Sequence, residues 1–463
     1  MEERFKRIND IQKEEGKYVA YWMQGNQRTR YNHSLEYGVM EANRMGVPLV
    51  VFFNLMDDYP EANYRHYYFM MEGLIDVRKE LKGRGIEFFL LYGDIVENIL
   101  EISRNALLLI CDKGYMKMDK MWRGEIADRI NCPMIEVESN LVVPVEVASN
   151  KEEYGARTIR PKIKRVLDDF LYDFQQEEYR VGKKVARKIV DGWKSIILPE
   201  EDSEELCGRL KLDRSVDRSK VFEGGEKAAQ RRLEEFLEEG LDTYSSLGSN
   251  PGKESVSKLS PYLHFGQISP LEIATRVLKE RNPQNAGDVE DFLEELIIRR
   301  ELAFNFIYYN ENYDKWDRIT YSWAYDTMRI HTSDEREYLY TLKELEEGST
   351  HDLYWNTAQR EMVGTGYMHG YMRMYWCKKI LEWSETPEAA YERAIYLNNK
   401  YFIDGRDPNS YTGVAWCFGK HDRAWKERAI YGKVRCMMAS GLERKFHMEE
   451  YIDRVEKVLR EGG

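Results

Sequence analysis

The first 150 residues alternate between short apolar segments and longer segments in which polar and apolar residues are mixed. The short segments are rich in residues that favour β-strands, and they lie at 18–23, 47–53, 86–92, 106–111 and 133–137. Near-continuous apolar strands between helices are typical of a parallel sheet that is covered on both faces. The sequence therefore predicts an α/β, Rossmann-like domain with five parallel strands over residues 1–145.

A sheet of this kind binds ligands at the carboxyl ends of its strands, where the strand order reverses. The end of the first predicted strand carries the segment Trp22-Met-Gln-Gly-Asn-Gln-Arg28. This segment lacks the Gly-x-Gly-x-x-Gly motif of dinucleotide-binding domains. The sequence thus indicates where a ligand would bind and leaves its identity open.

The segment at about 146–225 differs in composition from the sequence on either side. Residues 156–165 and 180–188 are strongly basic, and the acidic stretch 200–205 follows them. We interpret the segment as a connector that lies over the surface and forms some helix of its own. Its cations suit a rim that faces phosphates or a solvated charged linker, and both alternatives stay open.

From about residue 226 to residue 463, apolar residues follow helical spacing, as in 226–237, 289–306, 388–397 and the stretch after Met448. Few segments in this part have the composition of a strand, so we predict a larger all-α domain. Half of the ten tryptophans fall between residues 355 and 425, namely Trp355, Trp376, Trp383, Trp416 and Trp425. This concentration exceeds what ordinary packing requires.

Trp376 and Trp383 are seven residues apart in one predicted helix. Two helical turns return to nearly the same face, about 10 Å further along the axis, which suits electron hopping between indoles. Arg373 lies in the same segment and Asp404 lies downstream, so a buried cation and carboxylate could flank a redox ring. The alternative is a core helix with two packed tryptophans.

Charge, cysteines and hydropathy limit the class of protein. Six cysteines occur without a Cys-x-x-Cys pair, which fits reduced thiols in a cytoplasm and argues against a metal site. No run of about 18 apolar residues is present, so no membrane span is expected. The net charge of −12 argues weakly against nucleic acid as a partner, although a local basic groove is compatible with it.

Three longer motifs resemble a known family. They are Leu259-Ser-Pro-Tyr-Leu-His-Phe-Gly-Gln-Ile-Ser269, Met368-His-Gly-Tyr-Met-Arg-Met-Tyr-Trp376 and Asp404-Gly-Arg-Asp-Pro-Asn-Ser-Tyr411. Together they resemble the photolyase–cryptochrome superfamily, and the class II cyclobutane pyrimidine dimer photolyases in particular. The resemblance spans nearly the whole chain. It implies a U-shaped FAD inside the helical domain, active as the fully reduced anion.

The positions that match the family's flavin site are Tyr244, Val256, Ser257, Lys258, Leu259, Ser260, Arg300, Arg373, Asn398, Asp404 and Arg406. Tyr244 and the segment 256–260 match the part of the family that holds the flavin phosphates. The alternative is an ordinary loop in which Ser260 is the N-cap of the next helix. Arg373 and Asp404 match an ion pair beside the flavin ring, where a cation favours the anionic form. Asn398 matches an asparagine that faces flavin N5.

The resemblance further implies that the substrate is double-stranded DNA with a flipped-out cyclobutane pyrimidine dimer. The matching positions are Glu295, Met374 and Trp416 in the dimer pocket, and Arg423, Trp425 and Arg435 against the DNA. A carboxyl on the pyrimidine carbonyl would stabilise the dimer radical anion. For single residues the alternatives are a surface glutamate and a solvated basic face. Many relatives carry a tryptophan where this chain reads Ile298-Arg299-Arg300, so one wall of the pocket departs from the pattern.

Trp376, Trp383 and Trp355 match the family's photoreduction chain. The resemblance implies that an electron passes from a solvent-side indole to Trp376 and on to the flavin. This path restores the reduced cofactor and is separate from repair itself.

The function that the resemblance implies is light-driven splitting of cyclobutane pyrimidine dimers by an electron from reduced FAD. We expect a cytoplasmic monomer with access to chromosomal DNA. An antenna chromophore such as 8-hydroxy-5-deazaflavin would bind in the N-terminal domain, where the sequence does not settle its presence. The rivals are a cryptochrome-like photoreceptor, a flavoprotein for small molecules, and a (6-4) photolyase, whose histidine pair would fall at Gly370 and Met374.

Overall fold

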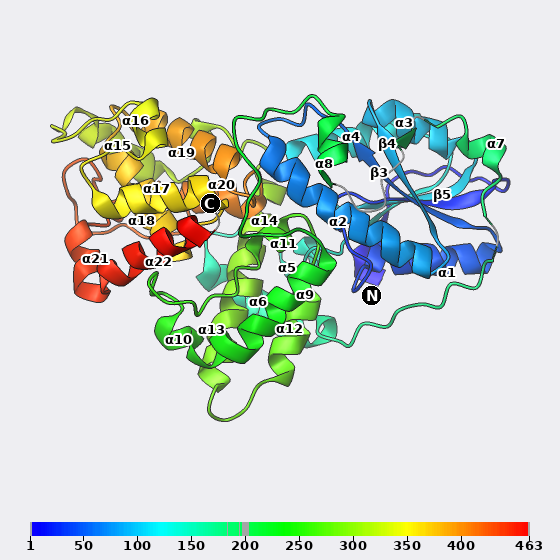
Figure 1. The fold of residues 1–463 in the computed structure, drawn as a ribbon, viewed down its shortest axis with the longest axis horizontal. Coiled ribbons are helices and arrows are strands. Elements are labelled where there is room, and N and C mark those ends of the chain that lie inside the picture. Colours follow the sequence, from blue (N-terminus) through cyan, green and yellow to red (C-terminus); the bar gives the residue numbers. More distant parts are fainter. Residues whose placement is uncertain (1, 183, 194, 197–202, 462–463) are drawn as a thin grey trace.

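The computed structural model describes residues 2–182, 184–193, 195–196 and 203–461, which form an α/β part beside a helical part (Figure 1). The α/β part contains one sheet in the order β1-β6-β5-β2-β3-β4-β7. Its strands are β1 (Phe5–Arg7), β2 (Tyr18–Trp22), β3 (Leu49–Leu55), β4 (Glu87–Tyr92), β5 (Ala106–Asp112), β6 (Met134–Val137) and β7 (Ser195–Ile196). Strands β2 to β6 pair in parallel, whereas β1 and β7 pair antiparallel at the edges. The five predicted parallel strands are confirmed, and the two edge strands were missed because they span only three and two residues.

Different helices cover the two faces of this sheet. α1 (His33–Met45) and α2 (Tyr64–Gly83) pack on one face, and α3 (Ile95–Ser103) and α4 (Lys117–Arg129) pack on the other. Successive strand residues point to opposite faces, so Ala20 packs with the α3 and α4 side and Tyr21 with the α1 side. All five residues of β2 are buried, which explains its continuous apolar sequence.

The first part of the connector, up to Phe170, packs against the helical part, and the remainder runs along the outside of the α/β part. It includes α5 (Val145–Ala148), α6 (Ala156–Phe170), α7 (Arg187–Val190) and α8 (Ser203–Gly208), with an extended stretch between α6 and α7 (Figure 1). In the basic helix α6, Arg160 pairs with Glu294, and Lys162 pairs with Glu153. Several of the predicted basic residues thus have acidic partners, as in a charged linker. Lys183 and residues 200–202 of the charged stretches lie outside the described residues.

The second part is helical, as predicted, and no strand occurs after residue 203 in the described chain. Its helices are α9 (Glu226–Glu235), α10 (Tyr244–Leu247), α11 (Ser260–His264), α12 (Pro270–Lys279), α13 (Ala286–Leu293), α14 (Arg300–Tyr309), α15 (Ser322–Ile330), α16 (Leu342–Glu347), α17 (Leu353–Thr365), α18 (Gly370–Glu382), α19 (Pro387–Tyr401), α20 (Pro408–Cys417), α21 (Ala439–Lys445) and α22 (Met448–Glu461). The π-helical turn Glu294–Arg299 joins α13 to α14 without a break. Among the described helices, none is both long and apolar enough to cross a membrane.

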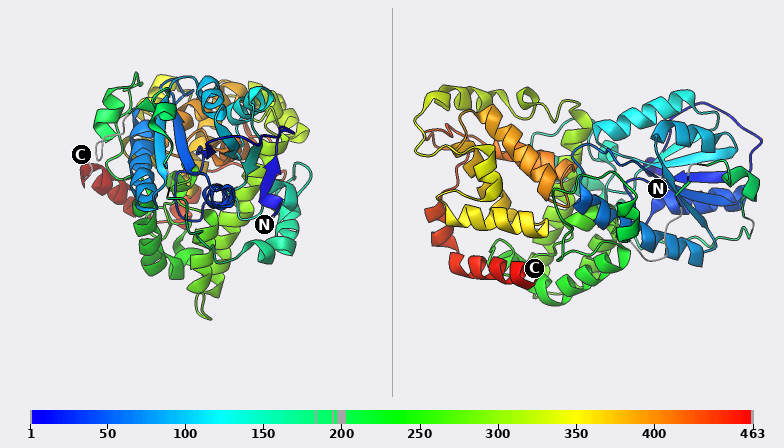
Figure 2. Two further views of the ribbon diagram at one scale, coloured as in Figure 1. Left: turned by 90° about the vertical axis from the view of Figure 1, so that its right-hand side faces the viewer. Right: turned by 45° about the horizontal axis from the view of Figure 1, so that its top comes forward.

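Buried polar contacts join the two parts, which lie side by side in the right-hand view of Figure 2. The Arg65 guanidinium of α2 donates to the carbonyl oxygens of Val363 (2.6 Å) and Tyr401 (2.8 Å). The Glu301 carboxyl of α14 accepts from the Val142 backbone N–H at 2.6 Å. Burial raises the pKa of Glu301 to about 8, so this carboxyl is mainly neutral at neutral pH.

Candidate functional site

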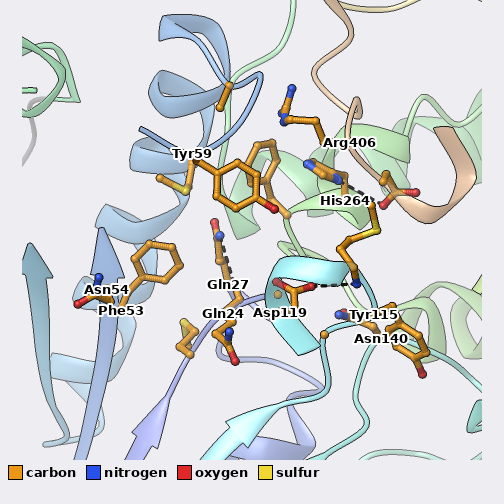
Figure 3. Close-up of a pocket in the computed structure, with 18 of the residues that line it drawn as sticks. Gln24, Gln27, Phe53, Asn54, Tyr59, Tyr115, Asp119, Asn140, His264 and Arg406 are labelled. Atoms are coloured by element: carbon orange, nitrogen blue, oxygen red, sulfur yellow. Dashed lines mark hydrogen bonds and ion pairs between the residues drawn. The ribbon is translucent and has the colours of Figure 1, made fainter. Parts of the chain in front are cut away.

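A pocket lies between the two parts, at the carboxyl ends of the neighbouring strands β2, β3 and β5 (Figure 3). Gln24 and Gln27 follow β2, Tyr115 follows β5, and the helical part contributes His264 and Arg406. The chain extends the sheet from β2 through β3 to β4 and then crosses to β5 on the other side of β2. The pocket is therefore at the reversal in strand order, where a sheet of this class binds ligands.

The pocket wall contains polar groups without protein partners. The side-chain oxygens of Gln24 and Gln27 are buried and accept no hydrogen bond from the described residues. Leaving such a group unpaired costs about 1–3 kcal/mol, so both oxygens suit a ligand with N–H or O–H donors. Burial raises the pKa of the Asp119 carboxyl in the same wall, which favours its neutral, donating form.

Two predicted flavin-site residues, Arg300 and Arg406, lie at this boundary between the parts. Arg300 Nη1 donates to the Asn140 carbonyl at 2.8 Å, and Arg406 Nη1 donates to the Asn399 carbonyl at 2.6 Å. Both side chains are buried, and burial lowers the pKa of each guanidinium. Their direct contacts with a flavin stay a prediction.

The predicted ion pair between Arg373 and Asp404 is present in the helical part. Arg373 Nη1 lies 3.0 Å from Asp404 Oδ1, and Arg373 Nε donates to the Met368 carbonyl one turn earlier. The guanidinium carbon lies 3.9 Å from the ring centre of Phe402. The ring of Trp376 packs on the same phenyl group, edge to face, at 6.3 Å. One aromatic side chain therefore links the ion pair to the tryptophan cluster.

Asn398 lies in the last turns of α19 and is 4% exposed. Its Nδ2 donates to Asn399 Oδ1 at 2.9 Å, which directs the amide. Its Oδ1 accepts no hydrogen bond from the described part of the chain. The amide thus has an acceptor available for a ligand donor.

The predicted phosphate segment forms a backbone nest. From Val256 to Leu259, no backbone N–H donates a hydrogen bond to any described residue. Lys258 has a left-handed φ of 51°, and Leu259 is right-handed helical. Adjacent residues of opposite hand turn their N–H groups towards one concave side, which binds anions. α11 begins at Ser260 itself and Leu259 precedes it, so the alternative role of Ser260 as N-cap is wrong.

Glu295 is exposed, yet the protein atoms around it raise the pKa of its carboxyl through partial desolvation. Burial and the nearby Glu295 carboxyl raise the pKa of Tyr244, and Tyr367, which is also close to Tyr244, lies 5.6 Å from the Arg373 guanidinium carbon. The fold therefore gathers Tyr244, Glu295 and Arg373 around one region, although 51 and 78 residues separate them in turn along the chain.

The three tryptophans of the predicted chain lie together in the helical core. Trp355 of α17 stacks on Trp376 with ring centroids 6.4 Å apart, and it meets Trp383 edge to face at 5.6 Å. Trp355 therefore lies between Trp376, which is in helix α18, and Trp383, which follows the end of that helix. All three rings are at most 2% exposed, so the expected solvent-side indole is not one of them.

The predicted DNA-facing residues gather around Arg435. Its guanidinium carbon lies 5.2 Å from the ring of Trp416 and 4.1 Å from the ring of Trp425, while Asp422 binds its Nε at 2.9 Å. The guanidinium carbon of Arg423 lies 4.9 Å from the ring centre of Trp425. Trp425 is 37% exposed, which makes it available to a partner.

The last predicted substrate residue, Met374, lies next to this group. Its carbonyl accepts a weak hydrogen bond from the Cys417 thiol, directly after Trp416 in α20. Met374 is also on α18, two residues before Trp376. Helix α18 thus connects the Trp416 wall to the tryptophan cluster.

Relatives of known name match this chain over almost its whole length. A deoxyribodipyrimidine photo-lyase of Methanothermobacter thermautotrophicus is 46% identical, and the match covers 98% of this chain and 99% of that protein. Proteins of the same name from Arabidopsis thaliana and Potorous tridactylus are 40% and 38% identical and cover 95% and 94% of this chain. They are covered over 89% and 81% of their own lengths. Such identity over a full chain decides the family. The chain belongs to the DNA photolyase family.

The fold agrees with solved photolyases. Residues 19–180 match the sequence model described as DNA photolyase. A class III photolyase from Agrobacterium tumefaciens superposes with a TM-score of 0.69 over 97% of this chain and 88% of that chain, at 16% identity. An archaeal photolyase from Sulfolobus tokodaii, described with two FAD molecules, gives 0.70 over 96% and 92%. At such identity these two structures bear on the fold alone.

In this photolyase, family motifs located the helical site and included Arg406 of the pocket, and the segment 22–28 marked the strand end that borders it. No family motif includes Gln24, Gln27 or Asp119. The position after the first strand was the available signal for the two glutamines. Asp119 is on α4, and only the packing of that helix brings it into the pocket wall.

Proposed function

We propose that this chain is a photolyase of the class II type that repairs cyclobutane pyrimidine dimers in DNA, using light and reduced FAD, and that it acts as a monomer. The observation that carries the proposal is the group formed by Arg373, Asp404 and Trp376 around Phe402. It places a partly buried ion pair, which could face an anionic ring, next to a line of oxidisable indoles. The near-full-length match to named photo-lyases supports the same activity.

The residues present fit FAD. The unpaired N–H groups of 256–259 suit a pyrophosphate, and the free Oδ1 of Asn398 suits the N5–H donor of a reduced flavin ring. Bound reduced FAD would supply an electron on excitation by light. Arg373 would offset the negative charge of the reduced ring, and Asp404 holds the guanidinium in place.

Glu295 and Trp416 would form opposite sides of the dimer pocket. The raised pKa of Glu295 favours a protonated carboxyl, which can donate to a pyrimidine carbonyl as negative charge develops there. The half-buried indole of Trp416 offers an apolar wall for the flipped-out bases. Met374 on the adjacent helix would complete the apolar surface.

Arg423, Trp425 and Arg435 would contact the DNA. A dimer pairs poorly, so flipping it out costs less than flipping normal bases. The exposed ring of Trp425 would occupy part of the gap, while Arg423 binds a phosphate. Arg435, which Asp422 binds and which lies between two indoles, would also position the Trp425 side chain.

The pocket between the parts would hold an antenna chromophore, such as 8-hydroxy-5-deazaflavin. Its free amide oxygens at Gln24 and Gln27 suit a ligand with polar hydrogens, and tyrosine, tryptophan, phenylalanine and methionine side chains are among the other lining residues. Gln24→Leu and Gln27→Leu should weaken binding of added deazaflavin in fluorescence titrations. Gln284→Leu, at an exposed position, should leave it unchanged.

The activity is tested by illuminating the reduced holoprotein with a dimer-containing oligonucleotide and following the recovery of thymine absorbance. Recovery should require both light and bound FAD, and Glu295→Ala should slow it. A holoprotein that photoreduces FAD but restores no dimer would contradict the repair function and favour a cryptochrome-like role.

A further inference from the structure

The three buried indoles of the tryptophan chain end at Trp383, which is 2% exposed and has no direct access to solvent reductants. Two side chains lie between its ring and the surface. Tyr340 contacts it edge to face at 5.4 Å, and His351 contacts it at 5.2 Å. Tyr340 is half-buried and His351 is exposed, so together they connect the core to solvent.

Tyr340 is held in a defined orientation on Trp383. Its backbone N–H donates to the Trp383 carbonyl at 3.2 Å. Its phenol oxygen accepts the backbone N–H of His351 at 2.9 Å and lies 2.7 Å from Nδ1 of the same histidine. Because the oxygen already accepts one hydrogen, its own proton is available to donate to Nδ1 of a neutral imidazole.

The indoles of Trp376 and Trp355 have no comparable proton acceptor. Trp376 Nε1 donates to Gln359 Oε1 at 2.8 Å, and Trp355 Nε1 donates to the Trp376 carbonyl at 3.0 Å. An amide oxygen is too weak a base to take a proton from an oxidised indole. An imidazole takes a proton near neutral pH, so at Tyr340 the loss of an electron can be accompanied by the loss of a proton.

The charges near Trp383 also favour movement of the oxidising equivalent outward. The Lys379 ammonium lies 5.6 Å from the Trp383 ring centre, where it stabilises the neutral ring. A positive charge on that ring would face the ammonium, which Glu382 pairs with at 2.5 Å. A neutral tyrosyl radical at Tyr340 carries no such charge.

We propose that Tyr340 is the outermost electron donor of the photoreduction chain and that His351 accepts its proton. One electron passes from the Tyr340 phenol to the oxidised Trp383, which becomes a neutral indole again. The phenol proton moves to His351 Nδ1, which leaves a neutral tyrosyl radical and an imidazolium open to solvent. The oxidant is the photoexcited oxidised flavin, so this inference rests on the proposed function.

The test is flash excitation of holoprotein that contains oxidised FAD, with transient absorption and with EPR of radicals trapped under illumination. In the parent protein, an indole radical signal should decay as a tyrosyl signal rises. Deuteration of the tyrosine rings should narrow the EPR signal. Tyr340→Phe should lose the tyrosyl signal, and the indole radical should then decay by charge recombination.

His351→Gln keeps the phenol and removes the base, so the yield of tyrosyl radical should fall although Tyr340 is intact. The matched control is Tyr338→Phe, because Tyr338 is exposed and stacks on His351 without a ring contact to Trp383. This control should retain the parent signals. Unchanged FAD absorbance in each variant excludes a loss of cofactor as the cause.

A tyrosyl signal that persists in Tyr340→Phe, or that is lost in Tyr338→Phe, would overturn the assignment. An indole radical with no tyrosyl successor in the parent would also overturn it, while leaving the tryptophan chain in place. Absence of both radicals in FAD-loaded protein would reject the tryptophan chain together with its extension.

Discussion

Trp355 stacks on Trp376 with their ring planes 7° from parallel and their centroids 6.4 Å apart. The contact joins α17 to α18 and makes Trp355 the middle member of the cluster, between Trp376 and Trp383. The seven-residue spacing along one helix had predicted direct electron hopping between Trp376 and Trp383. In the packed core, the ring of Trp355 contacts both of these indoles.

Trp355→Phe should abolish photoreduction of oxidised FAD, because the phenyl ring cannot replace the indole as an intermediate donor. Repair by chemically reduced enzyme should be nearly unchanged, since that reaction does not use the chain. Both are measured on one preparation, by flavin bleaching and by dimer splitting. Trp316→Phe is the control, because Trp316 packs on Tyr325, Tyr391 and Phe418 outside the chain. Loss of both activities in Trp355→Phe would indicate a folding defect.

Glu295→Gln should make repair less dependent on pH. The pKa of Glu295 is raised, so its donating, protonated form is lost as the pH increases through that value. An amide donates at every pH, and the variant should therefore retain more of its acidic-pH rate at alkaline pH. Glu295→Ala removes a hydrogen bond worth about 1 kcal/mol, or about a fivefold loss of dimer affinity. Glu290→Gln, at an exposed position of α13, should behave as the parent. Identical pH profiles in the parent, Glu295→Gln and Glu290→Gln would exclude the donor role.

Arg423→Ala should weaken DNA binding and lower the salt dependence by about one unit of the log–log slope, as expected for one lost phosphate contact. The side chain lies over Trp425 and forms no ion pair with the described residues, so its charge is available to DNA. Titrations at several salt concentrations measure the slope. Arg329→Ala on α15, where Asp326 already pairs with the arginine, is the control and should keep the parent slope.

Glu301→Gln should stabilise the protein at alkaline pH. The folded pKa of about 8 exceeds the ordinary value of 4.5. Between these values the unfolded chain releases a proton that the folded chain keeps, so this carboxyl lowers the stability as the pH rises. The amide cannot ionise, and the variant's melting temperature should exceed that of the parent at pH 8 while nearly matching it at pH 5. The exposed Glu311→Gln should show no such difference, and an equal gain at both pH values would contradict the assignment.

Local sequence was sufficient for the five parallel strands, because the central strands β2 and β3 are buried at every position and their sequences are almost entirely apolar. The helical character of the second part followed from spacing in the same way. The family motifs supplied the ion-pair residues Arg373 and Asp404, which meet at 3.0 Å. Short edge strands such as Phe5–Arg7 carried too few residues to be recognised.

The sequence by itself determined the fold class, the family and the residue types of the helical site, because these depend on periodicity and on contiguous motifs. Only the tertiary structure decided that Trp355 lies between Trp376 and Trp383, and that the Tyr340 phenol oxygen lies 2.7 Å from His351 Nδ1 at the outer end. It also decided that Gln24 and Gln27 share a pocket with His264. These relationships join segments that are distant in the chain, and no local pattern specifies which side chains meet once helices and sheet pack.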